Sequence, residues 1–562
     1  MTAAGTPVGL LAAARAWRDD DPDATTRAEL DRLVKQVEAG SAEARVELAD
    51  RFAGMLEFGT AGLRGALGAG PNRMNRSVVI RTAAGLVAHL DAVGVSGATP
   101  LVVIGYDARY NSDVFARDTA AVVVGAGGRA LLLPAPLPTP VLAFAIRYLG
   151  ADAGVMVTAS HNPPQDNGYK VYLGDGSQIV PPSDSQIAAR IAAVPSVSSV
   201  PLATDGWETV DDSLVEDYIS AVVSVLDPAS PRDLNCVHTS LHGVGHGTVA
   251  VAFARAGFPP PTPVDEQALP DPDFPTVAFP NPEEEGAIDL ALEQARRESC
   301  DLVIANDPDA DRCAAAVLDP AVGDWRMLRG DEVGALLGAH LVHRGVEPDD
   351  VFASSIVSSR LLAAIAAAAG IRHEETLTGF KWISRVEGLR YGYEEALGYC
   401  VAPHLVRDKD GVSAALLLAE LAATLKAGGR TLTDLLDDLA VAHGVYATDS
   451  FSVRVSDLSQ SEALMRRLRQ SPPGSVAGRA VARLDDLSLG VGGLPPTEGL
   501  RYHLDDDARI VVRPSGTEPK VKIYLEVIEP VPDVGSLAVA RAAAASRLGA
   551  IRAEFERLTL LP

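Results

Sequence analysis

Short apolar runs alternate with alanine-rich stretches along most of this chain. Each run ends in a polar loop, and a stretch with helical spacing follows it. Short runs of this kind are typical of buried strands, and their alternation with helices predicts α/β layers. Chemistry is then expected in the loops at the strand ends. The predicted strands are Leu101–Tyr106, Ala153–Thr158, Asn235–Thr239, Leu302–Ala305 and Val351–Ser355.

The two ends of the chain follow different patterns. Residues 1–50 predict a polar-faced helical extension with helices at Leu11–Trp17, Thr26–Val37 and Ala42–Phe52. The last segment shows strand-like alternation and two helical stretches, which together predict a smaller α+β domain. Its predicted elements are strands Ser450–Val455, Arg509–Val512 and Lys520–Val527, and helices Ser461–Arg469 and Val539–Leu558.

Proline- and aspartate-rich seams at residues 195–212 and 318–326, and residues 440–450 beyond them, suggest the domain boundaries. We therefore predict a helical extension followed by four domains. The predicted ranges are 1–50, 51–205, 206–322, 323–443 and 444–562.

Charge and composition narrow the classes of partner. The 562 residues include 49 basic and 74 acidic side chains, a formal net charge of −25. Nucleic acids and anionic membranes need a basic footprint, so we expect neither as a partner, although a local basic pocket for a small phosphate stays open. Four scattered cysteines without a Cys-x-x-Cys pair favour a reducing, cytoplasmic setting. Lysine occurs seven times against 42 arginines. Because the two are not interchangeable, each remaining lysine is a candidate for a chemical role.

The clearest motif is Thr158-Ala159-Ser160-His161-Asn162-Pro163-Pro164, with Lys170 shortly after it. One interpretation is a strand end whose turn is capped by hydroxyl groups. A hydrolytic triad is disfavoured because the Gly-x-Ser-x-Gly elbow is missing and adjacent Ser160 and His161 pair poorly. The third interpretation is a serine that accepts and donates a phosphoryl group, with Lys170 moving a proton or balancing charge.

A second motif, Asp307-Pro308-Asp309-Ala310-Asp311-Arg312, follows a predicted buried strand. Carboxylates at alternate positions of an extended segment point to one side, and their repulsion is relieved by a hard cation such as Mg²⁺. The loop lacks the glycine of an EF-hand and the threonine of an aspartyl-phosphate phosphatase. The alternative is a solvated acidic turn.

Three further loops carry weaker signals. Arg513-Pro514-Ser515-Gly516-Thr517-Glu518-Pro519-Lys520 is a turn that could equally form a phosphate clamp. Gly392–Tyr399 presents Glu394 and Glu395 for sugar hydroxyls, or is only an exposed helix start. Phe58–Gly65 is a glycine-rich loop with Arg64 that fits neither the dinucleotide nor the P-loop spacing.

Taken in order, these motifs resemble those of the α-D-phosphohexomutase superfamily over roughly Phe58 to Glu526. The Phe58–Gly65 loop, the N-terminal extension and Thr378–Ile383 resemble the branch of phosphoglucomutase-2-type enzymes and phosphopentomutases. The resemblance implies an α/β fold of four domains around a central cleft. Three of these domains are similar, and the smaller last domain is mobile.

The resemblance also implies residue roles. Ser160 would be the phosphoserine, and Asp307, Asp309, Asp311 and the Ser160 phosphate would bind Mg²⁺. The transferred group would be surrounded by Arg64, His161 and Lys170, with Lys170 as the proton-transfer partner. The remaining implied contacts to substrate are Arg312, Lys381, Glu394, Glu395, Arg513, Ser515, Gly516, Thr517 and Lys520.

The expected activity is a phosphosugar mutase that interconverts glucose 1-phosphate and glucose 6-phosphate, with glucose 1,6-bisphosphate as activator. Ala396 stands where many members have a serine, which leaves the sugar preference open to mannose or pentose. A metal-dependent sugar phosphatase and a catalytically silent sugar-phosphate-binding regulator are the other hypotheses. We expect small sugar phosphates as the partners and a monomer or weak dimer as the assembly.

Overall fold

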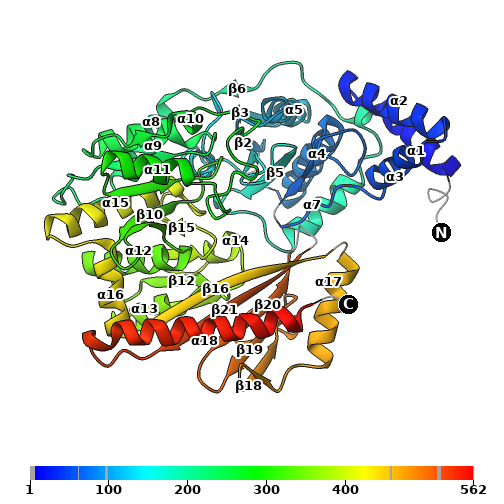
Figure 1. Ribbon diagram of the computed structural model, residues 1–562. Coiled ribbons are helices and arrows are strands. Elements are labelled where there is room, and N and C mark those ends of the chain that lie inside the picture. Colours follow the sequence, from blue (N-terminus) through cyan, green and yellow to red (C-terminus); the bar gives the residue numbers. More distant parts are fainter. Residues whose placement is uncertain (1–6, 61, 95–98, 456–457, 516–519, 561–562) are drawn as a thin grey trace. The chain divides into compact units, whose positions relative to one another are not determined.

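The computed structural model describes residues 7–60, 62–94, 99–455, 458–515 and 520–560. The chain divides into two compact units, and each is described by itself (Figure 1). The first consists of Met1–Met327 with Gly398–Glu420, and the second of Leu328–Leu397 with Leu421–Pro562. These units are not the four predicted domains, whose boundaries stay predictions.

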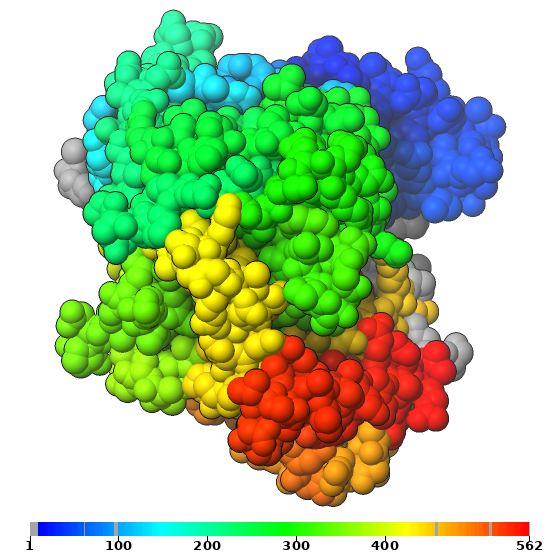
Figure 2. All heavy atoms as spheres, turned by 60° about the vertical axis from the view of Figure 1, so that its left-hand side comes forward, coloured from blue at the N-terminus to red at the C-terminus, as the bar shows by residue number. Residues whose placement is uncertain are grey.

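The N-terminal extension is helical, as predicted, and forms a surface lobe of the first unit (dark blue in Figure 2). Asp23 and Ser41 accept hydrogen bonds from the first-turn amides of the second and third helices, and so determine where these helices begin. Leu30, Leu33 and Leu48 are buried in a small core shared by the three helices. The helices are α1 (Pro7–Asp20), α2 (Ala24–Glu38) and α3 (Ala42–Arg51).

The first unit contains a mixed sheet in the order β1-β5-β4-β2-β3-β6. The strands from β4 to β6 in this order are parallel, while β5 and β1 are antiparallel to their neighbours. The strands are β1 (Leu63–Ala66), β2 (Leu101–Tyr106), β3 (Arg129–Leu132), β4 (Ala153–Val157), β5 (Asp166–Leu173) and β6 (Glu208–Thr209). The helices of this region are α4 (Arg76–Val93), α5 (Ser112–Gly125), α6 (Thr139–Tyr148) and α7 (Ser183–Ala192).

A second sheet of the same unit has the order β11-β10-β9-β7-β8, with β9, β7 and β8 parallel. Its strands are β7 (Cys236–Thr239), β8 (Thr262–Pro263), β9 (Leu302–Ala305), β10 (Ala314–Asp319) and β11 (Asp324–Met327). Its helices are α8 (Ser213–Val223), α9 (Gly245–Arg255), α10 (Asp265–Ala268) and α11 (Asp289–Glu298).

The second unit begins with a parallel sheet in which β12 lies between β13 and β14. These strands are β12 (Val351–Ser355), β13 (Arg372–Thr376) and β14 (Leu389–Glu394). The accompanying helices are α12 (Gly330–Arg344), α13 (Leu361–Ala368), α14 (Phe380–Ile383) and α16 (Leu432–His443). The segment of the first unit that interrupts this region begins with β15 (Gly398–Cys400) and ends at Glu420, within α15 (Gly411–Ala427).

The last sheet is antiparallel, in the order β16-β21-β20-β19-β18-β17. Its strands are β16 (Val445–Arg454), β17 (Ser475–Val476), β18 (Arg479–Asp486), β19 (Leu500–Leu504), β20 (Arg509–Pro514) and β21 (Lys520–Glu529). Helices α17 (Leu458–Gln470) and α18 (Leu537–Leu558) complete this region. Three α/β regions and a smaller α+β region confirm the predicted fold class.

Helix α18 is long and apolar enough to meet the length and hydropathy test for a membrane span. Its Ala544, Ile551 and Phe555 are buried in the core beside the antiparallel sheet, while its outer face lies at the surface (red in Figure 2). We interpret α18 as a helix that packs one face on the antiparallel sheet, because its buried residues belong to the core of that region.

Candidate active site

Ser160 lies at the turn between β4 and β5, where parallel-sheet enzymes carry their chemistry. The residue is 3% exposed and has a left-handed backbone with φ 51°, a conformation that a non-glycine residue adopts only when its surroundings hold it. Thr158 Oγ1 accepts the Ser160 amide at 2.8 Å. The Ser160 hydroxyl donates to Asp307 Oδ2 at 2.7 Å and lies 3.2 Å from His161 Nδ1.

The buried Arg109, which follows β2, stabilises this turn. Its guanidinium donates to the carbonyl oxygens of Ser160 at 2.6 Å, Pro163 at 2.8 Å and Asp166 at 3.1 Å. Sequence reasoning missed this residue. The signal was present, because Asp107-Ala108-Arg109 follows a predicted strand at the edge where the site was expected.

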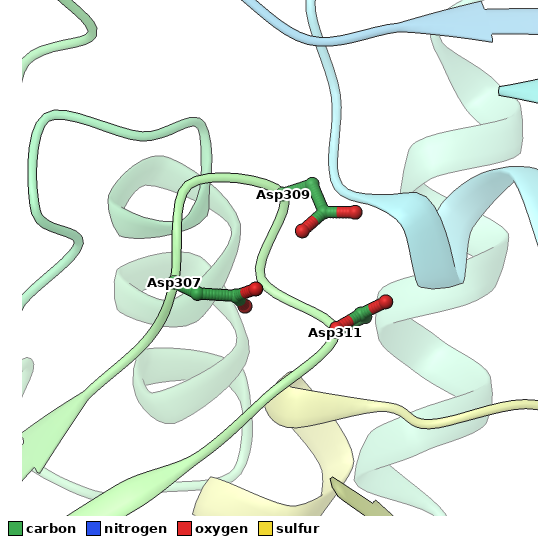
Figure 3. A group of neighbouring side chains, drawn as sticks. All are labelled: Asp307, Asp309 and Asp311. Carbon is green, nitrogen blue, oxygen red and sulfur yellow. The ribbon is translucent and has the colours of Figure 1, made fainter. Parts of the chain in front are cut away.

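The three aspartates of the second motif converge in the loop between β9 and β10 (Figure 3). One carboxylate oxygen from each of Asp307, Asp309 and Asp311 lies within 4.8 Å of the others, and all three residues are buried. The premise of an extended segment was wrong. The chain turns at Ala310, whose φ is 53° and whose amide donates to the Asp307 carbonyl at 2.8 Å. This turn, and not strand alternation, brings the carboxylates together.

Two of the three carboxylates, those of Asp309 and Asp311, each have one oxygen that accepts hydrogen bonds and one oxygen without a hydrogen-bond partner among the described residues. Lys170 Nζ donates to Asp309 Oδ2 at 2.7 Å and to Asp311 Oδ2 at 2.8 Å. Thr139 Oγ1 donates to Asp309 Oδ2 at 2.6 Å. The Oδ1 atoms of Asp309 and Asp311 are buried without a hydrogen-bond partner among the described residues. Hard, unpaired, converging oxygens are what a divalent cation such as Mg²⁺ requires, so the residues present fit this ion.

Thr139 and Lys409 are further members of the cluster that sequence reasoning missed. Thr139 begins α6, and its amide also donates to the Asp309 carbonyl at 2.9 Å. Lys409 Nζ lies 3.0 Å from Asp311 Oδ2. Lysine scarcity was a usable signal for Lys409, whereas nothing in the local sequence marked Thr139.

The pKa of Asp307 shifts in the opposite direction from the pKa values of Asp309 and Asp311. Burial, together with Asp309 and Asp311, raises the pKa of Asp307 to about 8. Burial also acts on Asp309 and Asp311, but Lys170 outweighs it and holds both of their pKa values below the ordinary range. Burial alone would lower the pKa of Lys170, yet Asp309 and Asp311 raise it. The raised pKa of Asp307 shows that burial and like-charge repulsion disfavour its ionised form, and a bound cation would relieve both.

Arg64, His161 and Arg312 complete the cluster of the first unit. Arg64 lies on β1 and donates to Asn162 Oδ1 at 3.0 Å, and burial lowers the pKa of its guanidinium. The Arg312 amide donates to Asp307 Oδ1 at 3.1 Å. The first unit therefore brings together the predicted residues Arg64, Ser160, His161, Lys170, Asp307, Asp309, Asp311 and Arg312.

The other predicted residues lie in the second unit. Lys381 is in α14, and Glu394 at the end of β14 accepts the Gly379 amide at 2.5 Å. Glu395 Oε2 accepts hydrogen bonds from the hydroxyls of Ser355, the last residue of β12, and Ser358, in the loop after it.

The predicted phosphate loop also belongs to this unit. Arg513 lies near the end of β20, Lys520 begins β21, and the Ser515 amide donates to the Lys520 carbonyl at 2.8 Å. Gly516 and Thr517 lie outside the described residues.

Four family models match this chain in order. They describe the α/β/α domains I, II and III and the C-terminal domain of phosphoglucomutase/phosphomannomutase, and they match residues 55–197, 216–320, 329–442 and 452–544. The chain belongs to the phosphoglucomutase/phosphomannomutase family. It is a phosphosugar mutase of the α-D-phosphohexomutase superfamily, an isomerase that transfers phosphoryl groups. Its acidic triad is consistent with the Mg²⁺ site of that superfamily.

Relatives in this family carry different substrate names. A "Probable phosphomannomutase" of Haemophilus influenzae is 48% identical over 81% of this chain and 93% of its own length. The human phosphopentomutase is 35% identical over 92% of this chain and 90% of its own length. The structure of a phosphoglucomutase/phosphomannomutase family protein from Burkholderia thailandensis is 19% identical, with a TM-score of 0.68 over 89% of this chain and 96% of its own.

Proposed function

We propose that this mutase interconverts glucose 1-phosphate and glucose 6-phosphate through a phosphoserine at Ser160 and a glucose 1,6-bisphosphate intermediate. The observation that carries the proposal is the Ser160 hydroxyl, 2.7 Å from a carboxylate of a buried three-aspartate cluster. A phosphoryl group on that hydroxyl would stand beside the cation-binding oxygens and within the group formed by Arg64, His161 and Lys170.

The proposed reaction conserves the phosphoryl group. A free sugar hydroxyl attacks the phosphorus on Ser160, the bond from phosphorus to Ser160 Oγ breaks, and the sugar becomes doubly phosphorylated. The bisphosphate then reverses its orientation in the site. Ser160 Oγ attacks the other phosphorus, the bond from that phosphorus to the sugar oxygen breaks, and the isomer is released. The proton that leaves the attacking hydroxyl and returns to the leaving oxygen is assigned to Lys170. When bound, Mg²⁺ supplies charge neutralisation for the transferred oxygens.

The chain's own residues do the positioning. Asp309 and Asp311 would hold the cation, and each has an oxygen that Lys170 and Thr139 leave unpaired. Arg109 fixes the serine turn so that the hydroxyl stays aimed at Asp307. In the second unit, Lys381, Glu394 and Glu395 are proposed to contact the sugar. Arg513, Ser515, Gly516 and Thr517, assisted by Lys520, are proposed to bind the non-reacting phosphate.

Phe58–Gly65 and Thr378–Ile383 resemble the branch of phosphoglucomutase-2-type enzymes and phosphopentomutases, so they are compatible with glucose and with pentose phosphates. Mannose and pentose phosphates belong in the test because the relatives are named for them. We also propose a cytoplasmic enzyme that is a monomer or weak dimer and is activated by glucose 1,6-bisphosphate, because loss of the intermediate leaves unphosphorylated Ser160.

The test measures conversion of glucose, mannose and ribose 1-phosphates with Mg²⁺, with and without glucose 1,6-bisphosphate. We expect the highest kcat/KM for glucose 1-phosphate, stimulation by the bisphosphate, and loss of activity in Ser160→Ala. Preference for mannose or ribose would retain the mechanism and change the substrate. Steady phosphate release without isomer would instead establish a phosphatase. Unchanged activity in Ser160→Ala would overturn the phosphoserine.

A further inference from the structure

The loop between β12 and α13, residues 356–360, contacts two different parts of the second unit. One side of the loop bonds the predicted sugar-recognition loop, and the other bonds strands of the C-terminal domain. Nothing in the sequence marked this loop. Its Ser358 and Ser359 are 1% and 2% exposed, so their hydroxyls act inside the protein and not on solvent.

On the first side, Ser358 anchors the sugar-recognition loop. Its hydroxyl donates to Glu395 Oε2 at 3.0 Å and accepts the Glu395 amide at 3.1 Å. Ser355, the last residue of β12, donates to the same carboxylate oxygen at 3.1 Å. The Glu395 backbone and side chain are therefore both fixed by one small group of hydroxyls.

On the second side, the next two residues bond Glu526 of β21, which is 2% exposed. Ser359 Oγ donates to Glu526 Oε1 at 2.9 Å, and the Arg360 amide donates to the same oxygen at 2.8 Å. Arg360 Nε donates to Glu526 Oε2 at 2.6 Å. A buried carboxylate with this many donors resists displacement, because any shift leaves charge unpaired away from water.

Arg509 of β20 also contacts both the loop and Glu526. Arg513 lies on the same strand. Its guanidinium donates to the Ser358 carbonyl and lies 3.3 Å from Glu526 Oε2 and 3.1 Å from Glu375 Oε1. An apolar cluster covers the same boundary, in which Ile356 and Val357 of the loop pack with Val511 and Tyr524 of the sheet.

We propose that residues 356–360 act as a connector that couples the sugar-recognition loop to the strands carrying the phosphate loop. The roles of those two loops rest on the proposed function. The connector makes both loops respond to substrate as one piece, so that the sugar ring and its distal phosphate are held at a set separation.

Two substitutions break the connector at opposite ends. Ser358→Ala removes the bonds to Glu395, and Glu526→Gln weakens those to Ser359 and Arg360. We expect each to raise KM for the preferred sugar 1-phosphate about threefold to tenfold, the range for one or two lost hydrogen bonds. The Mg²⁺ concentration for half-maximal activity should stay unchanged, because the metal ligands lie in the other unit. Ser452→Ala and Glu347→Gln, at exposed positions of the same unit, are the controls.

The double variant gives the decisive readout. Once one end is broken, breaking the other adds little, so its KM should lie within about twofold of the larger single effect. Effects that multiply would overturn the connector. If Glu526→Gln does not fold by circular dichroism, Ser359→Ala, which loses only one bond to Glu526, replaces it in the cycle.

Hydrogen exchange separates the connector from the proposed function. In Glu526→Gln, or in Ser359→Ala if it takes that place, amide exchange across 394–397 should accelerate although the change is at the far end of the connector. Unchanged exchange there would overturn the proposal. If the wild-type enzyme isomerises none of the sugar phosphates, the proposed function fails, and this exchange measurement alone decides whether the coupling exists.

Discussion

At the scale of single residues, the aspartate cluster depends on which carboxylate oxygen accepts each hydrogen bond. Thr139 and Lys170 both donate to Asp309 Oδ2, so Oδ1 stays unpaired among the described residues and would be available to a cation. Thr139 would therefore act through Asp309, by orienting a carboxylate that binds the metal.

We expect Thr139→Val to raise the Mg²⁺ concentration for half-maximal activity about tenfold, because a hydrogen bond to a charged group contributes about 1.5 kcal/mol. Activity at saturating Mg²⁺ should change far less. Thr139→Ser keeps the hydroxyl and should restore the wild-type dependence on Mg²⁺. An unchanged Mg²⁺ titration in the valine variant would contradict this role.

His238 provides a residue-scale test of pH dependence. It is fully buried, pairs with His246 and Asn306, and burial lowers its pKa from 6.5 to about 4. The unfolded chain then binds a proton more tightly than the folded one. The stability that the neutral ring contributes is complete above pH 6.5 and is lost as the pH falls towards 4.

We therefore expect the difference in unfolding free energy between wild type and His238→Asn to shrink by about 1–3 kcal/mol between about pH 7 and about pH 4.5. Urea unfolding at both pH values measures it. The exposed His343→Asn serves as the control. A difference that is independent of pH would show that His238 is not held neutral by the fold.

At the scale of elements, the site depends on close packing between loops. A Cβ on Gly243, in the loop after β7, would lie 2.2 Å from Pro308 Cα and 2.4 Å from its carbonyl oxygen, both backbone atoms of the aspartate turn. The Val244 amide also donates to that carbonyl at 2.9 Å. The loop after β7 therefore supports the aspartate turn through direct backbone contact.

Gly243→Ala should displace the turn at 307–310 and lower Mg²⁺ affinity at least tenfold, because misplaced ligands lose the geometry that the ion requires. Isothermal titration with Mg²⁺ measures the change. Gly247→Ala is the matched control, since a Cβ there meets nothing within 4 Å. Equal affinities for the two variants would contradict the support role.

At the scale of the whole molecule, the candidate residues divide between the two units. The serine, the aspartates and their lysines belong to the first, and the proposed sugar and phosphate loops to the second. Ligands that bind one set should stabilise that unit first, because binding energy is added only where contacts form.

We expect Mg²⁺ alone to slow hydrogen exchange across 158–170 and 302–313 and to leave 374–397 unchanged. Adding a sugar 1-phosphate should extend the protection to 374–397. In Asp309→Asn, Mg²⁺ should no longer slow exchange across 158–170 and 302–313. Protection by Mg²⁺ confined to the second unit would refute the assignment of the metal site.

Much of this architecture is already present in local sequence. The apolar runs at 101–106 and 302–305 are buried strands because short, continuous apolar segments need cover on both faces. The Ser160 and Asp307 motifs were found because hydroxyl and carboxylate groups directly after such strands have few structural uses. Their joining by a hydrogen bond is a tertiary fact, since they are 147 positions apart.

The sequence by itself determined the alternation of strands and helices, the family, and the candidate residues of each loop, since these depend on local spacing and composition. Only the tertiary structure decided how the groups act on one another. It placed Thr139 and Lys409 on the aspartates and Arg109 behind the serine turn. It also placed the 356–360 connector between two loops. These contacts join residues far apart in the chain, where no local pattern reports distance or burial.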